Sequence, residues 1–239
     1  SQAFLQSLAI SEKLAEAEPD RADYQRDLSV SYNKVGDLYR ALGQGEPARQ
    51  AFLESLAIIQ KLAEAEPDRA DYQRDLSVSY NKVGDLYRSL GQGEAARQAL
   101  LQSLAIREKL AEAEPNRADY QSDLCVSYER MGDLSGEDGN AEQAAGWYNK
   151  SLAIWERLIQ AEPDRADHRR GSVIPLLRLA GTAGEHSAEY FLRALDTCEE
   201  LKRTGRLDPV DEPMLAALRQ MISEAPKTDD ESSGDSLQP

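Results

Sequence analysis

Two histidines, several carboxylate pairs and one glycine-rich turn are the features of this sequence that could bind metals or phosphate, or support acid–base catalysis. His168 and His186 lie outside any HExxH arrangement and have no cysteine beside them, so their spacing does not predict a zinc site. Carboxylate pairs such as Glu64 and Glu66 recur at polar helix ends, where solvated charge is a better explanation than catalysis. The glycines at 43–45 recur 48 residues later at a predicted turn between helices, which is typical of turn chemistry. We therefore predict a protein that is not an enzyme, with no metal site and no cofactor.

The two cysteines are the remaining candidates for reactive chemistry. Cys125 and Cys198 fall in predicted helical segments and have no second cysteine nearby. Cys125 also stands where Ser29 and Ser77 stand in earlier copies of a repeat, which favours a small packed side chain. Because disulfide frameworks need several paired cysteines, the pattern predicts none, and it favours a reducing, cytoplasmic setting.

The balance of charge limits the classes of partner. The chain of 239 residues carries a formal net charge of −15. An acidic surface repels phosphate groups, which argues against nucleic acid and against anionic membrane surfaces. No apolar run approaches the roughly 18 residues of a membrane-spanning helix. The abundant Ala, Leu, Glu, Arg and Gln favour helices instead.

An internal repeat dominates the sequence. The tetrad Ser-Leu-Ala-Ile begins at Ser7, Ser55, Ser103 and Ser151, always 48 residues apart. Residues 4–51 and 52–99 differ at five places, namely Gln6/Glu54, Ser11/Ile59, Glu12/Gln60, Ala41/Ser89 and Pro47/Ala95. A fixed period of this length indicates a stack of similar supersecondary units rather than a single compact domain.

One copy of the repeat encodes two helices. The first is predicted at about 23–42, with Asp23 as its cap and one buried stripe stepping by four and three residues: Leu28, Tyr32, Val35, Tyr39 and Leu42. The glycines at 43–45 end it, and the second helix begins near Glu46 and ends before Pro67. Two antiparallel helices cannot bury both stripes alone, so neighbouring units must cover them.

These residues resemble the tetratricopeptide repeat at nearly every signature position. Seven positions carry the resemblance: the aromatic Tyr32, the Leu-Gly-like pair Val35 and Gly36, Tyr39, and the small–aromatic–small trio Ala48, Phe52 and Ser55. The resemblance covers about residues 1–205. It implies an all-α fold, a right-handed α-α superhelix of antiparallel helical hairpins, and a role in binding proteins.

The repeat departs from the family in length. The family unit has about 34 residues, so each unit here is longer and its two helices can each gain about two turns. Such long units are similar to those of kinesin light chains and of bacterial multi-repeat proteins. The extra length implies a deeper and broader groove.

The pattern decays toward the C-terminal end. We predict the second helix of a truncated repeat at 1–20, repeats at 21–68 and 69–116, and a partly degenerate repeat at 117–164. A degenerate repeat with a capping helix follows at 165–224, where Pro175 is expected to interrupt a helix, and an acidic disordered tail at 225–239. The start in mid-hairpin suggests a piece of a longer protein and leaves Phe4 and Leu5 on an uncovered stripe.

The first helices carry the candidate binding surface, because the resemblance implies that they line the concave face. The outward rows are Val30, Asn33, Asp37 and Arg40 in one unit, Val78, Asn81, Asp85 and Arg88 in the next, and Glu129 and Asp133 in the third. Asn side chains can clamp a peptide backbone, an Asp row favours a basic partner, and Arg can bind a carboxylate. The alternative is that Asp and Arg pair internally on neighbouring helices and form a solvated face.

The sequence leaves more than one function open. The leading hypothesis is a protein–protein interaction scaffold that holds a peptide or protein segment, which can be a basic one, in the concave groove. The alternative is a sensor or regulatory repeat array of a larger signalling protein whose effector domain lies upstream of Ser1. Self-association through uncovered ends of the stack is a third possibility.

Overall fold

The structure is a computed structural model that describes residues 2–182 and 184–224. In this part of the chain there are ten α-helices and no strand. The chain divides into two compact units, residues 1–158 and 159–239, with the division inside α7. The predicted acidic tail at 225–239 lies outside the described residues.

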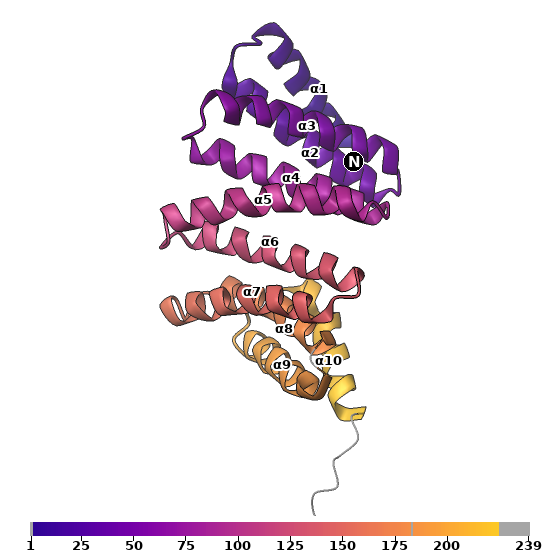
Figure 1. The fold of residues 1–239 in the computed structure, drawn as a ribbon, viewed down its shortest axis with the longest axis vertical. Coiled ribbons are helices and arrows are strands. Elements are labelled where there is room, and N and C mark those ends of the chain that lie inside the picture. The colour runs from indigo at the N-terminus through magenta and orange to yellow at the C-terminus, as the bar shows by residue number, and fades with distance from the viewer. Residues whose placement is uncertain (1, 183, 225–239) are drawn as a thin grey trace, which may run out of the picture. The chain divides into compact units, whose positions relative to one another are not determined.

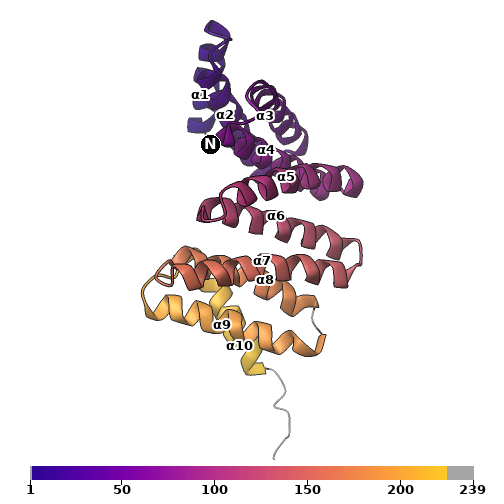
Figure 2. The same ribbon diagram turned by 60° about the vertical axis from the view of Figure 1, so that its left-hand side comes forward.

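The first unit is a succession of long antiparallel helices (Figures 1 and 2). The helices are α1 (Gln2–Ala17), α2 (Ala22–Ala41), α3 (Gly45–Ala65), α4 (Ala70–Ser89), α5 (Gly93–Ala113), α6 (Ala118–Glu137) and α7 (Ala141–Ala161). Each of α1 to α5 packs against the helix that follows it. At 20 or 21 residues, α2 to α7 each extend about 30 Å.

The turns between paired helices depend on one glycine in each repeat. Gly43, Gly91 and Gly139 have φ angles of 70°, 70° and 78°, in the left-handed region that favours glycine. After Gly43, the Gln44 N–H donates to the Tyr39 carbonyl at 2.9 Å, which closes the end of α2. The expectation that Asp23 caps α2 is wrong, because Arg21 holds the N-cap position and Asp23 lies in the first turn.

A second glycine in each first helix allows close packing against the second helix. A Cβ built on Gly36 lies 2.6 Å from Cε1 of Phe52, and one built on Gly84 lies 2.7 Å from Cδ2 of Leu100. The backbone of the first helix therefore takes the place of a side chain where the two helices meet. This contact explains why a glycine stands opposite a large side chain at both positions.

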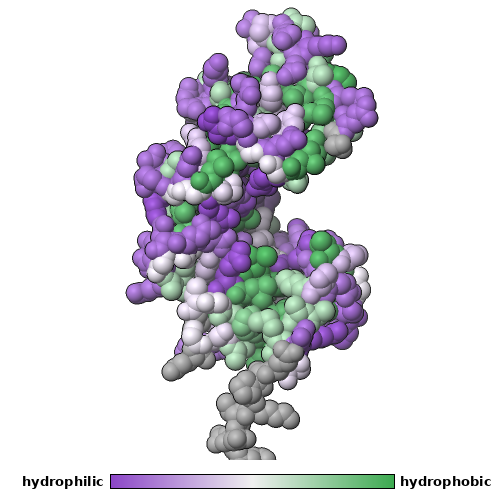
Figure 3. Space-filling model, turned by 90° about the vertical axis from the view of Figure 1, so that its right-hand side faces the viewer, coloured by the Kyte–Doolittle hydropathy of each residue, from purple (hydrophilic) through white to green (hydrophobic). Residues whose placement is uncertain are grey.

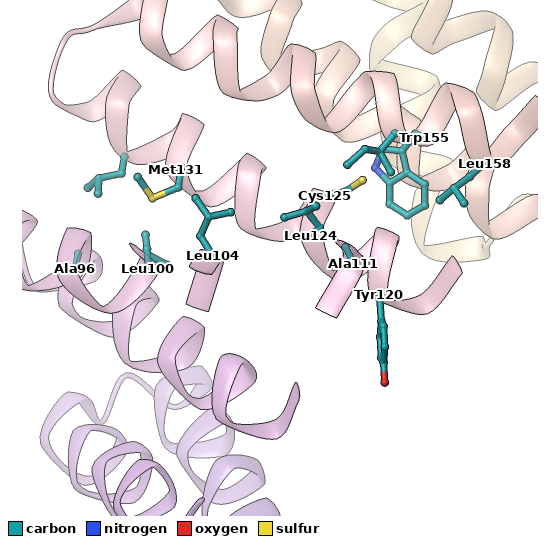
Figure 4. Close-up of a cluster of buried hydrophobic side chains, with 12 residues drawn as sticks. Ala96, Leu100, Leu104, Ala111, Tyr120, Leu124, Cys125, Met131, Trp155 and Leu158 are labelled. Atoms are coloured by element: carbon teal, nitrogen blue, oxygen red, sulfur yellow. The ribbon is translucent and has the colours of Figure 1, made fainter. Parts of the chain in front are cut away.

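The core of the first unit consists of several hydrophobic clusters spaced along the stacked helices. One cluster joins α5, α6 and α7, and Figure 4 shows Cys125 of α6 beside Trp155. Further clusters surround Phe52 and Ile59. On α1, in contrast, Phe4, Leu5, Ile10 and Leu14 remain exposed, as the sequence predicts for the first two.

The second unit is smaller and consists mainly of α8 (Ala166–Thr182), α9 (Ser187–Arg203) and α10 (Glu212–Glu224). α9 packs against both α8 and α10. Its core includes Leu215 and Cys198. The expected interruption at Pro175 is wrong: α8 runs through this residue, because its φ is compatible with a helix and the packing around its buried side chain offsets the lost backbone N–H bond.

On the face that Figure 3 shows, hydrophilic residues predominate and the hydrophobic residues form separate patches. None of the helices in the described residues is long and apolar enough to cross a membrane.

Candidate partner-binding surface

The predicted Asp rows lie on α2, α4 and α6, where ion pairs join each first helix to the next. Lys82 Nζ lies 2.6 Å from Oδ2 of Asp37, and Arg130 Nε lies 3.0 Å from both carboxylate oxygens of Asp85. Arg88 Nη1 lies 3.2 Å from Oδ2 of Asp133. We call this surface the first-helix strip, and it consists of Asp37, Lys82, Asp85, Arg130, Arg88 and Asp133.

Two residues of the strip, Lys82 and Arg130, are absent from the sequence-predicted set. The two partners of each pair are 45 residues apart, which is one 48-residue repeat minus three residues, or about one helical turn. A basic residue stands three positions before the Asp in each unit, and that regularity is the signal that sequence reasoning missed. The internal pairing weighed as the alternative is therefore present in the structure.

The strip is more open at its α2 end. The side chains of Asp37 and Arg40 are 38% and 42% exposed, whereas that of Asp85 is 12% exposed. Arg40 Nη2 lies 3.1 Å from Oδ1 of Asp37, so this carboxylate contacts two cations and remains accessible. A partner can reach Asp37 and Arg40 more readily than the charges on α4 and α6.

The Asn row faces inward instead of outward. Asn33 Nδ2 donates to Ser79 Oγ at 3.0 Å, while its Oδ1 is buried and has no hydrogen-bond partner among the described residues. Asn81 is almost fully buried. With its amide turned so that Oδ1 faces Arg107, Oδ1 lies 3.0 and 3.2 Å from the two terminal guanidinium nitrogens. Both amides bond to other residues of the protein, namely Ser79 and Arg107. A peptide-clamping role for them stays a prediction.

Arg107 occupies the middle of this buried polar row. It donates to Ser77 Oγ at 3.0 Å, to the Asp123 carbonyl at 2.5 Å and to Ser127 Oγ at 3.3 Å. Burial among these neutral oxygens lowers the pKa of Arg107 to about 10. Within the described residues, this desolvated cation bonds to neutral oxygens and to no carboxylate.

Glu129 is the third member of the Asn row and is also turned inward. Its Oε1 accepts from Ser151 Oγ at 2.7 Å and from Trp155 Nε1 at 3.4 Å. Burial raises the pKa of this carboxyl above its usual value, although both hydrogen bonds favour the charged form. The remaining predicted residues, Val30 and Val78, are half-buried.

The described residues contain no group of three or more His, Cys, Asp or Glu side chains placed to hold a metal ion. Burial raises the pKa of the Cys125 thiol, whose Sγ lies 3.5 Å from the Ser151 carbonyl. Cys125 therefore has the environment of a packed core residue rather than that of a reactive thiolate.

Comparison with known proteins identifies the repeat. The tetratricopeptide repeat family matches residues 28–68 and 76–116. No curated protein matches the chain.

Two solved structures share the arrangement of helices. BtubC (BKLC) from P. vanneervenii is 13% identical, with a TM-score of 0.52 over 100% of this chain and 96% of that one. A putative kinesin light chain from Podosopora anserina, with nearly identical TPR-like repeats, is 22% identical, with a TM-score of 0.50 over 84% and 86%. At these identities the likeness shows the fold alone. Arrays of this type typically serve as scaffolds for protein–protein interaction through their extended surfaces. Residues 28–68 and 76–116 are therefore tetratricopeptide repeats, and the described part of the chain is all-α, with the α-α superhelical fold of these solved structures.

Proposed function

We propose that the chain holds a peptide or protein segment against α2, α4 and α6, along the first-helix strip. The observation that supports this is the regular row of charged groups of both signs on three successive helices. Three carboxylates and three cations alternate there through interhelical pairs of 2.6 to 3.2 Å. An extended segment that carries charges of both signs could follow such a row.

The open end of the strip sets the expected chemistry of the partner. Asp37 is accessible to a lysine or arginine of the partner, and Arg40 beside it can bind a carboxylate through two hydrogen bonds. Because Asp85 and Asp133 are already neutralised by Arg130 and Arg88, the partner needs only a few basic groups. We therefore expect a mixed-charge segment with a basic residue at the α2 end.

A phage-displayed library of random dodecapeptides provides a partner for the test. Peptides selected against the full chain are titrated into the double variant Asp37→Lys with Lys82→Asp, which retains the ion pair and reverses its direction. We expect the helical circular-dichroism signal to be unchanged and the peptide affinity to fall by about tenfold, since one favourable contact becomes a repulsion.

The matched control reverses an exposed pair elsewhere, Glu199→Arg with Arg219→Glu, whose Nε–Oε1 distance is 2.6 Å. This control should leave peptide binding intact. Equal binding by the wild-type chain and the Asp37/Lys82 swap would remove the first-helix strip from consideration.

We also propose that the chain works in a reducing, cytoplasmic setting. This is supported by two buried cysteines that are both free, Cys125 and Cys198. Fractionation of cells that express the native protein would test it, and recovery from an oxidising compartment would contradict it.

A further inference from the structure

A pocket of about 350 Å³ opens between the second helices α1 and α3, above the first helix α2. Two tyrosines, Tyr32 and Tyr39, line it together with the buried Val35 and Ala51. The pocket lies among residues that the first-helix strip does not include. It therefore offers a second surface, formed by a different set of side chains.

Carboxylates surround the tyrosines of this pocket. Glu12, Glu46 and Glu54 all line it, and Tyr32 Oη donates to Oε1 of Glu12 at 2.9 Å. Glu46 is neutralised by Arg49, at 2.7 Å, whereas Glu54 has no ion pair or hydrogen bond within the described residues. Burial, the hydrogen bond to Glu12 and the charges of Glu12 and Glu54 together raise the pKa of Tyr32 to about 12. The pocket thus combines aromatic rings with negative charge that is only partly compensated.

The equivalent site two repeats further on, around Tyr128, contains a lysine side chain of the same protein. Tyr128 stands at the repeat position of Tyr32, and its hydroxyl donates to Glu108 at 3.2 Å, as Tyr32 donates to Glu12. There Lys150 Nζ lies 5.4 Å from the centroid of the Tyr128 ring and 4.3 Å from that of Trp147. A lysine ammonium over two aromatic rings is a favourable cation–π arrangement.

The first repeat has no lysine at this position. Glu54 stands at the position of Lys150, and Ala51 at that of Trp147. The alanine in place of tryptophan leaves space in the first repeat. The glutamate in place of lysine gives that space a negative charge instead of a positive one. The tyrosine and its glutamate partner remain in place, without the cation that covers them in the later repeat.

The middle repeat has the same tyrosines but less charge. Its positions equivalent to Glu12 and Glu54 are Gln60 and Gln102, while Tyr80 and Tyr87 match Tyr32 and Tyr39. It is therefore a natural control within the same molecule, with the rings present and two carboxylates replaced by amides.

From this juxtaposition we infer that the pocket between α1 and α3 binds a lysine side chain presented by a protein partner. The ammonium would lie over Tyr32, as Lys150 lies over Tyr128, between the carboxylates of Glu12 and Glu54. The alkyl stem would pack against the apolar wall formed by Val35 and Ala51. This surface is separate from the first-helix strip, so either proposal can fail without the other.

The test titrates the blocked peptide acetyl-Gly-Gly-Lys-Gly-Gly-amide into the full chain and follows the tyrosine ring signals by NMR. We expect the Tyr32 and Tyr39 signals to move with low affinity, and those of Tyr80 and Tyr87 to move much less. The same peptide with norleucine in place of lysine keeps the alkyl chain, removes the charge and should cause no shift.

Two variants complete the experiment. Glu12→Gln with Glu54→Gln gives the pocket the amides of the middle repeat and should weaken lysine-peptide binding roughly fivefold, the combined effect of two exposed ion pairs. Glu54→Lys places a lysine where Lys150 stands in the later repeat, and should occupy the site and abolish binding. Equal shifts with the norleucine peptide, or binding that survives both variants, would overturn the inference.

Discussion

Residues 28–68 and 76–116 are two repeats of nearly the same sequence that satisfy their buried polar groups in different ways. In the first, the second helix carries Ile59, which is fully buried, and the Oδ1 of Asn33 lacks a hydrogen bond within the described residues. In the second, Arg107 replaces the isoleucine and faces the equivalent amide of Asn81. The surrounding serines are the same in both repeats.

The difference shows that the same helical packing can hold side chains of different polarity at one buried position. The turns and the close glycine contacts occur in both repeats, yet one position holds either an apolar side chain or a guanidinium. A buried cation is tolerated where several neutral oxygens converge on it, and an apolar residue is tolerated where one amide oxygen is left without a partner. Stacking therefore does not depend on this polar row.

The largest effect should come from truncating the arginine. Arg107→Ala leaves a cavity and deprives Ser77, Asn81 and Ser127 of their donor, and we expect it to lower the free energy of unfolding by about 3 kcal/mol. Arg107→Ile instead gives the second repeat the interior of the first. It should change stability by less than about 1 kcal/mol, since it also removes a desolvated charge.

Urea unfolding followed by circular dichroism measures both variants. A loss for Arg107→Ile as large as that for Arg107→Ala would show that the guanidinium is essential to the second repeat. The two interiors would then not be interchangeable.

The glycine contacts offer an intermediate effect. Gly36→Ala forces a methyl group against the ring of Phe52, which is fully buried, and should cost about 2 kcal/mol even after the gain in helix propensity. Gly84→Ala meets Cδ2 and Cγ of the buried Leu100 at 2.7 and 2.8 Å, and should cost about 1 kcal/mol, because an aliphatic side chain can change rotamer where the Phe52 ring has less freedom.

The control is Gly146→Ala, whose Cβ meets nothing within 4 Å and which should stabilise by up to about 1 kcal/mol. Shifts in the midpoint of urea unfolding compare the three. Equal losses for Gly36→Ala and Gly84→Ala would mean that the aromatic and aliphatic contacts are equally rigid.

The smallest effect concerns the third repeat, where Glu129 stands in place of Asn33 and Asn81. Because folding raises the pKa of Glu129 above its ordinary 4.5, this carboxyl favours the folded state most when protonated. Its contribution is complete below pH 4.5 and is lost as the pH rises through the folded-state pKa. Glu129→Gln still accepts from Ser151 and Trp155, and should be more stable than the wild type at pH 7 by up to about 1 kcal/mol.

Denaturant unfolding at a series of pH values tests the sign. The advantage of Glu129→Gln should shrink as the pH falls toward 4.5. A variant that is less stable than the wild type at pH 7 would show that the ionised carboxylate stabilises the third repeat.

Local features of the fold could be predicted from the sequence because their causes lie within a few residues. The turn at Gly43 needs a left-handed residue, and the spacing of Tyr32, Val35 and Tyr39 needs a helix. The expectation for Pro175 was wrong because its outcome does not depend on nearby residues alone. A proline's effect depends on whether the surrounding packing retains the helix, and the sequence alone does not show that packing.

The candidate surface was only partly predictable. Asp37, Asp85 and Asp133 lie in one row, as the repeat period implies, but their cations come from helices 45 residues away. Asn33 and Asn81 share the outward spacing of Asp37 and nevertheless turn inward. Residues at the boundary between the buried and exposed faces of a helix can point either way. Whether they become buried depends on the helix that packs beside them.

The 48-residue repeat by itself determined the hairpins, their turns and the likeness of residues 28–68 and 76–116 to the tetratricopeptide repeat, because these depend on short-range sterics and on the periodicity of apolar residues. Only the tertiary structure decided which polar groups face solvent, which pair across helices and where a pocket stays open. Those outcomes depend on what a neighbouring repeat places opposite each side chain. Glu54 and Lys150 hold the same position in the repeat, and the one borders an open pocket while the other covers a tyrosine.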